Sequence, residues 1–289
     1  ENGVRLPSGF SSRVLARSGD VVAGTDFVWH DAPDGGGVID SSGGGWWYVS
    51  NAEVSAGGGG VTALEFDAEG AVIGARSILA GTSRNCAGGV TPWGTWLSCE
   101  EVSLGEVYEC DPVEPARSSV RPALGAFHHE AAVVDAVDGS VYLTEDRPDG
   151  RMYRFVPDAA ADLTSGSLSA LAIGRASSSV GVGETVAVSW VPTSTAEPDR
   201  SSATTGFDGG EGAWMDGDRL LFTTKGDRRV WALDVRTDRL MLVHDCGVDP
   251  STPLDAVDNI VVHQGTGDVY IAEDGGDMQL CVLRERPDG

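Results

Sequence analysis

Residues 85–101 read Asn85-Cys86-Ala-Gly-Gly-Val-Thr-Pro92-Trp-Gly94-Thr-Trp-Leu-Ser-Cys-Glu100-Glu101. The run predicts two extended segments joined by a tight turn at residues 92–94, because Pro and Gly are the residues that punctuate strands. A thiol stands at the head of the first segment, and two adjacent carboxylates end the second. The arrangement is informative because it recurs along the chain.

Four segments share this pattern. In each, a strand with an acidic side chain or a thiol near its start is followed by a turn, a second strand with a polar end, a loop and a third strand. The four begin at Cys86, Glu130, Glu211 and Asp258, so the spacings are 44, 81 and 47 residues. A weaker unit begins at Gly45. Spacings of about 45 residues are typical of the blades of a β-propeller.

We therefore predict an all-β protein in which residues 1–289 form one β-propeller domain of five to six blades. The 81-residue step requires an extra element. We place an insertion or irregular region around residues 159–207, which contains a Ser/Ala-rich segment and one expected strand, 186–191. The 40 glycines and 13 prolines between short apolar runs agree with an all-β fold rich in turns.

The composition excludes several classes of partner. Asp and Glu outnumber Lys and Arg by 44 to 20, which gives a net charge of −24. Such a surface repels nucleic acid and anionic membranes. No run of about 18 apolar residues is present, so we expect no membrane span. We expect a monomer that does not bind nucleic acid.

The repeat also predicts where a functional site lies. The innermost strand of each blade lines the central channel, so equivalent positions of successive blades converge. Two sets of equivalent positions follow from the alignment: Cys86, Glu130, Glu211 and Asp258 in one, and Asn51, Glu100, Glu145 and Glu273 in the other. Converging carboxylates attract hard cations such as Ca²⁺, and a thiolate among them favours a transition metal. We predict a metal site at one mouth of the channel, although any single carboxylate could instead be a turn or cap residue.

The five cysteines suggest a partial disulfide pattern. Cys99 and Cys110 fall on neighbouring predicted strands, and Cys246 and Cys281 flank the last repeat. We expect these two pairs to form disulfides, which leaves Cys86 free. Disulfides would indicate an exported protein, and we expect any secretion signal to have been removed before Glu1.

These motifs resemble the PhoX family of secreted, calcium-dependent alkaline phosphatases. The resemblance extends over nearly the whole chain and is most specific in residues 85–101. The other matching segments are 6–10, 50–53, 127–132, 142–146, 210–214, 258–262 and 273–275.

The resemblance implies a β-propeller that holds iron and calcium at the channel mouth and hydrolyses small phosphomonoesters in a secreted or periplasmic setting. It implies that the metals neutralise the phosphate and that the nucleophile is generated among them. Eight residues match implied metal ligands: Cys86 for iron, Glu100 and Glu101 for iron or calcium, then Glu130, Glu211, Asp258, Asn51 and Glu273.

One departure from the family pattern concerns phosphate binding. The phosphatases place an arginine two residues before the glutamate matched by Glu211, whereas this chain has Gly209. Lys225 or Arg147 could replace it, so Glu211, Lys225 and Arg147 are the candidate catalytic residues. Two alternatives remain open: a Ca²⁺-dependent lactonase, which would have no use for the Cys86 thiolate, and a metal-binding propeller without catalytic activity.

The ends of the chain carry a further expectation. Propellers commonly close their ring by joining strands from both termini in one blade, and we expect residues 6–17 to contribute such a strand. Relatives continue past Gly275 with at least one more strand. We therefore expect either a further C-terminal piece beyond Gly289 or a ring that closes with fewer strands.

Overall fold

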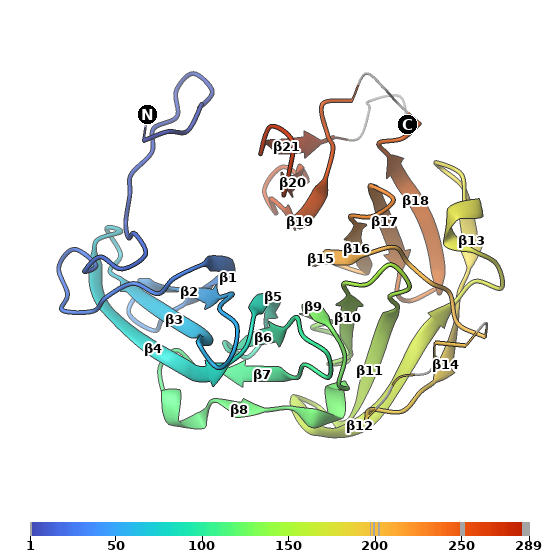
Figure 1. Cartoon of the computed structure of the whole chain (residues 1–289), viewed down its shortest axis with the longest axis horizontal. Coiled ribbons are helices and arrows are strands. Elements are labelled where there is room, and N and C mark those ends of the chain that lie inside the picture. Colours follow the sequence, from blue (N-terminus) through green and yellow to red (C-terminus); the bar gives the residue numbers. More distant parts are fainter. Residues whose placement is uncertain (1, 197, 199, 202, 249–251, 285–289) are drawn as a thin grey trace.

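The computed structural model describes residues 2–196, 198, 200–201, 203–248 and 252–284. Its strands form five antiparallel sheets that follow one another around a central channel, so the protein is a β-propeller with five blades (Figure 1). The described residues also contain three short 3-10 helices: η1 (Pro115–Arg117), η2 (Pro122–Leu124) and η3 (Ser177–Ser179).

Each of the first two blades has four strands in chain order from the channel outward. Blade one contains β1 (Pro33–Asp40), β2 (Trp46–Ala52), β3 (Gly59–Phe66) and β4 (Val72–Thr82). Blade two contains β5 (Asn85–Val90), β6 (Trp96–Glu100), β7 (Val107–Cys110) and β8 (Ser119–Val120).

The remaining blades follow the same order, with one exchange at their outer edges. Blade three contains β9 (His129–Val134), β10 (Val141–Glu145), β11 (Met152–Ala159), β12 (Asp162–Ala172) and β14 (Ser189–Pro192). Blade four contains β15 (Gly210–Asp216), β16 (Arg219–Thr224), β17 (Arg229–Asp234), β18 (Arg239–Asp245) and β13 (Thr185–Ala187). Blade five contains β19 (Val257–Val262), β20 (Val269–Glu273) and β21 (Leu280–Leu283).

The predicted repeat is confirmed. Cys86, Glu130, Glu211 and Asp258 all lie at the start of the innermost strand of a blade, on β5, β9, β15 and β19. The long step between the second and third repeats holds two outer strands rather than the single strand expected at 186–191. Thr185–Ala187 pairs with β18, whereas Ser189–Pro192 pairs with β12, so this segment connects blades three and four.

Glycines allow the inner strands to approach closely. At Gly89 on β5, an added Cβ would lie 2.0 Å from the carbonyl oxygen of Ala132 on β9. No side chain fits there, and the backbones of blades two and three meet directly. Outside this ring, apolar side chains fill the wedges between blades, as Tyr142, Phe222 and Trp231 do between blades three and four.

The two expected disulfides are wrong, because all five cysteines are free. In the β6–β7 ladder Cys99 faces Val107 while Cys110 faces Trp96. Trp96 and Cys99 are three residues apart, so the two thiols point to opposite faces of the blade. Cys99 packs in the core between blades two and three, and Cys110 in the core between blades one and two. Cys246 and Cys281 share one core but remain unbonded.

The N-terminal segment also differs from expectation. Residues 6–17 form no strand, and the described residues before β1 contain one isolated β-bridge, between Val21 and Val28. Val22 and Trp29 instead pack on the face of blade one that points away from blade two. The strand that begins the ring is β1, which the sequence pattern did not reveal.

The channel has a lateral opening in the described part of the chain. A cavity of about 830 Å³ runs along the channel and is lined by β1 residues such as Val38 on one side and by Tyr270 and Leu280 of blade five on the other. Figure 1 shows β1 and blade five on either side of this sector. Within the described residues, no helix has the length and apolar character that crossing a membrane requires.

Candidate metal centre

All five inner strands carry a metal-ligating type of side chain at their second residue. These residues are Asp34, Cys86, Glu130, Glu211 and Asp258. Each inner strand also has a register shift, or β-bulge, within its first residues. A bulge re-aims the side chain beside it, and here the re-aimed side chains meet at one end of the channel.

Three of these carboxylates form a tight group. Glu130, Glu211 and Asp258 each place one oxygen within 4.8 Å of the others. Glu130 and Glu211 are 1% and 3% exposed, and the Oε1 atom of each has no hydrogen-bond partner. Buried polar atoms are almost always paired. Two orphaned carboxylate oxygens at one point therefore indicate a cation-binding site.

A second ring of charged residues surrounds the first. It consists of the residue that directly follows the second strand of each blade: Glu53, Glu101, Asp146, Lys225 and Asp274. The backbone N–H of each of these residues donates to the carbonyl of the residue just before the inner strand. Those acceptors, which we call the rim positions, are Ala32, Arg84, His128, Gly209 and Ala256.

The two rings contribute to a second possible ligand group. Glu53, Cys86 and Glu101 each place a ligand atom within 4.8 Å of the others. Arg84 lies directly on this group: its Nε and Nη2 donate to Glu53 Oε1 at 3.0 and 2.7 Å, and Nη2 also donates to Glu101. The Cys86 thiol lies 3.4 Å from Asp34 Oδ2.

Lys225 is the corresponding cation of the first group. Its Nζ lies 3.5 Å from Asp258 and 2.5 Å from Asp274. Burial opposes its charge, but the hydrogen bond that its Nζ donates to Asp274 and the nearby carboxylates of Glu211 and Asp258 raise its pKa. Lys225 therefore stays protonated beside the acidic group. Arg147, the other candidate, pairs only with Asp149 at 3.2 Å and is half-exposed.

The electrostatics show that two cations do not neutralise the site. Burial, reinforced by neighbouring carboxylates, raises the pKa of Glu211 to about 9 and that of Glu101 to about 7. Burial likewise raises the pKa of Asp34 to about 6, and it raises the pKa values of Glu130 and of the Cys86 thiol well above their usual range. Like charges at close range disfavour ionisation, so Glu211 is protonated at neutral pH unless a metal cation takes the place of its proton, and ionisation of Glu130 and of the Cys86 thiol is disfavoured in the same way.

Three expected ligands are not in either ligand group. Glu100 accepts hydrogen bonds from the backbone N–H of Ser83 and Glu106. Glu273 accepts them in the same way from Asp255 and Gln279. The equivalent Glu145 accepts from the N–H of Arg151 and pairs with Arg200. These carboxylates hold the loops on either side of their blades, and their oxygens are already occupied.

Asn51 is the third. Its amide donates to the carbonyls of Cys86 and Ala87, while Trp96 and Ser98 donate to its Oδ1. Asn51 thus fixes the start of β5 from the neighbouring blade. It was also aligned one residue early, because Ala52 is the residue that matches Glu100 in the ladder.

Four residues of the two rings were missed: Asp34, Glu53, Asp146 and Asp274. The signal for Asp34 was present, since Asp34-Gly-Gly-Gly resembles Cys86-Ala-Gly-Gly and precedes a strand by a similar interval. Glu53, Asp146 and Asp274 would have followed from aligning the residue after each second strand, the position that Glu101 occupies in blade two.

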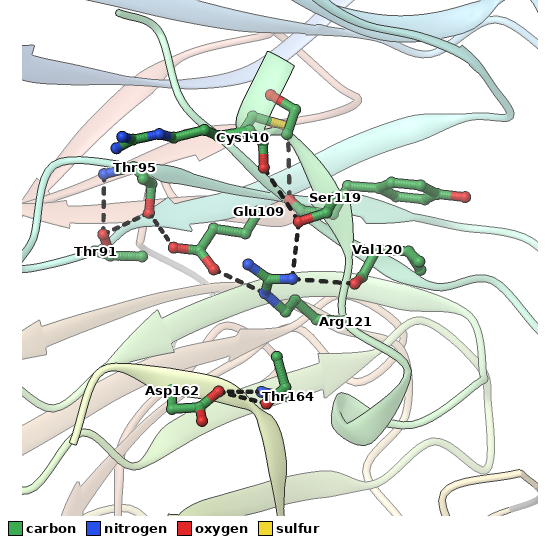
Figure 2. A network of polar contacts seen from close by, with 12 residues as sticks. Thr91, Thr95, Glu109, Cys110, Ser119, Val120, Arg121, Asp162 and Thr164 are labelled. Carbon is green, nitrogen blue, oxygen red and sulfur yellow. Dashed lines mark hydrogen bonds and ion pairs between the residues drawn. The ribbon is translucent and has the colours of Figure 1, made fainter. Parts of the chain in front are cut away.

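Another polar network, on blade two, has the opposite character. Glu109 accepts hydrogen bonds from Thr95 and Arg121, both at 2.8 Å (Figure 2). The indole N–H of Trp93 also donates to Glu109, at 2.6 Å. Glu109 borders a cavity of about 260 Å³. Because every oxygen of Glu109 has a partner, this network stabilises the blade and offers no ligand position.

Comparisons with known proteins agree with this geometry. The sequence model of the alkaline phosphatase PhoX family matches residues 71–106 and 102–232, which together are more than half of the chain. The chain belongs to the PhoX family. None of the curated proteins matches it.

Among solved structures, PhoX of Pseudomonas fluorescens, in complex with the transition-state analogue vanadate, is similar to this chain with a TM-score of 0.70 and 16% identity. The match covers 94% of this chain and 81% of that one. A structure of the nidogen/laminin complex follows with a TM-score of 0.50 and 11% identity, covering 82% and 72%. At these identities the likeness shows the propeller fold alone.

Proposed function

We propose that this protein is a secreted or periplasmic, metal-dependent phosphomonoesterase. The observation that carries the proposal is the pair of buried, unpartnered carboxylate oxygens of Glu130 and Glu211 at the channel mouth of a chain from this family. A site of this charge binds metal cations, and the cations allow an otherwise repelled phosphate to approach.

The donor atoms suit two kinds of metal. Glu130, Glu211 and Asp258 offer only oxygen, which is the ligand of Ca²⁺. Glu53 and Glu101 share their position with the Cys86 thiol, and sulfur favours a transition metal such as iron. We assign calcium to the first group and iron to the second, with Asp34 close enough to serve the Cys86 position.

The chain's own residues supply the other parts of the reaction. When bound, the cations offset the charge of the phosphate and lower the pKa of a nucleophile. Lys225, held between Asp258 and Asp274, is placed to donate to a phosphate oxygen as a point charge. Asp146 and Glu101, both in the second ring, add two carboxylates to the edge of the site, and burial raises the pKa of each.

The test is metal analysis of protein purified without chelator, followed by hydrolysis of p-nitrophenyl phosphate with and without Ca²⁺. We expect bound iron and calcium, and activity that chelator removes and Ca²⁺ restores. Bound metal with no hydrolysis of any phosphomonoester would refute the proposed activity. Hydrolysis of a lactone instead would identify a lactonase.

Gly209 favours a second candidate, a metal-binding propeller without catalysis. This rim position has no side chain, and its φ of +68° belongs to the left-handed region that glycine occupies most easily. A guanidinium fork for phosphate is therefore absent from blade four. The same assay separates the two candidates.

A further inference from the structure

The rim positions of the five blades are structurally equivalent but chemically different. All accept a hydrogen bond from the residue that follows the second strand. Four of them, Ala32, Arg84, Gly209 and Ala256, also have a positive φ between 44° and 68°. Arg84 is the one rim residue that carries a permanent charge, and it holds a long side chain in a conformation that non-glycine residues seldom adopt. Because alanine occupies two of the equivalent positions with nearly the same φ, the backbone conformation belongs to the fold, and the guanidinium is what distinguishes Arg84.

The guanidinium of Arg84 lies where a metal ion would bind. It contacts Glu53 through two N–H groups and Glu101 through one. These are the two carboxylates that form a ligand group with Cys86. Arg84 already donates to one oxygen of Glu53 and one of Glu101, and a metal ion bound by the same two carboxylates would be repelled by the guanidinium charge, so Arg84 and a metal compete for this pair.

The side chain of Arg84 is accessible to solvent. It is 40% exposed, whereas the side chains of its charged partners Glu53 and Glu101 are 29% and 11% exposed. Arg84 also interacts electrostatically with Asp146 of blade three. Burial raises the pKa of Asp146, and the positive charge of Arg84 is among those that oppose this rise. The displaced guanidinium would therefore remain above the channel mouth, across from Gly209, which offers no side chain.

We propose that Arg84 is a tethered cation that occupies the Glu53–Cys86–Glu101 group when metal is absent, and that metal binding displaces it to the mouth, where it binds the phosphate. The inference rests on the proposed function for the identity of the anion. The bidentate guanidinium contact to phosphate, which Gly209 cannot make, is thereby assigned to Arg84, the equivalent rim position of blade two.

The experiment compares the full-length wild-type protein with Arg84→Gln. Arg117→Gln is the matched control, because Arg117 forms a surface pair with Glu114 and lies outside the site. Metal-free protein is titrated with Co²⁺, whose thiolate charge-transfer absorption reports binding at Cys86. Arg84 forms two ion pairs that a bound metal must displace, so Arg84→Gln should bind Co²⁺ about two- to thirtyfold more tightly.

The second measurement uses the metal-loaded proteins. Inorganic phosphate is titrated calorimetrically, and Arg84→Gln should bind it about tenfold more weakly, since charge-assisted hydrogen bonds are lost. Arg84→Lys keeps the charge but not the fork, so it should bind Co²⁺ like the wild type and phosphate with intermediate affinity.

Shifts of opposite sign, tighter metal and weaker phosphate, support the proposal. Unchanged or weaker Co²⁺ binding in Arg84→Gln would overturn it, because a residue that merely positions the carboxylates would weaken metal binding. Unchanged phosphate binding would overturn it as well. Neither measurement depends on turnover. If both affinity shifts occur in a protein that has no phosphatase activity, the proposed function is refuted but the role of Arg84 is not. If neither protein binds Co²⁺, both ideas fail.

Discussion

Glutamates at neighbouring positions of this propeller have two different roles, as candidate metal ligands or as acceptors for backbone N–H groups, and their hydrogen-bond partners distinguish the two. Glu211 has an oxygen that is buried and unpartnered, whereas both oxygens of Glu273 accept backbone N–H groups. The first kind needs a cation and the second already has its partners. Residue type and spacing alone could not separate them, because the two kinds alternate within the same repeat.

Replacing Glu211 by Gln keeps the shape of the side chain but removes an anionic ligand. We expect Ca²⁺ affinity to fall at least about tenfold, because affinity depends on the number of charged ligands. Isothermal titration measures this, with Glu114→Gln on the surface as control. Equal affinity in the two variants would exclude Glu211 as a ligand.

Cys86 is free in the structure, and its thiol faces carboxylates on several blades. We expect Cys86→Ser to abolish the thiolate-to-iron absorption and to reduce bound iron, while bound calcium changes little. The same substitution at Cys246 is the control, because that thiol packs in an apolar core. Peptide mapping without reduction that finds Cys86 in a disulfide would contradict the assignment.

At the scale of the element, each inner strand begins with a β-bulge and continues as a regular strand that packs against the inner strands of the neighbouring blades. The bulge turns the second side chain into the channel, and glycine at positions such as Gly89 lets neighbouring strands touch. The sequence predicted the first three strands of blades two to five and four of the five converging positions, but not the outer strands β4, β8, β12 and β18. It missed β1, because the Asp34-Gly-Gly-Gly start offers few apolar residues to mark a strand.

The loop-binding carboxylates supply an element-scale prediction. In Glu273→Gln one backbone N–H would face an amide N–H group instead of an acceptor. We expect the free energy of unfolding to fall by about 1–3 kcal/mol, with Ca²⁺ affinity unchanged within about twofold. Urea unfolding in chelator measures the first quantity. A large loss of Ca²⁺ affinity without a loss of stability would instead place Glu273 among the ligands.

At the scale of the whole molecule, the site brings together side chains from all five blades. Ligand side chains come from every blade, so bound cations would hold the ring together from its centre. The sequence could predict this convergence from the repeat. It could not predict the lateral opening beside β1 or the packing of residues 22–29 on blade one, since both depend on which faces the ring leaves uncovered.

This convergence makes the stability of the metal-free protein depend on pH in an unusual direction. Burial raises the pKa values of Asp34, Glu101 and Glu211 to about 6, 7 and 9, whereas in the unfolded chain these groups titrate near 4. Between pH of about 4 and these folded-state pKa values, the folded protein therefore binds more protons than the unfolded chain. The stabilisation is complete below pH of about 4 and is lost as the pH rises through each folded pKa.

In chelator we therefore expect the melting temperature to be highest near pH 5 and to fall by at least about 5 °C towards pH 9. Saturating Ca²⁺ and iron should remove most of this fall, because cations then take the place of the protons. Glu211→Gln should flatten the upper part of the curve in chelator, since an amide does not titrate. Differential scanning calorimetry at pH 5, 7 and 9 provides the measurement. A melting temperature that rises with pH in chelator would show that the channel-facing carboxylates are already neutralised by Arg84 and Lys225, and that the site has no need of metal.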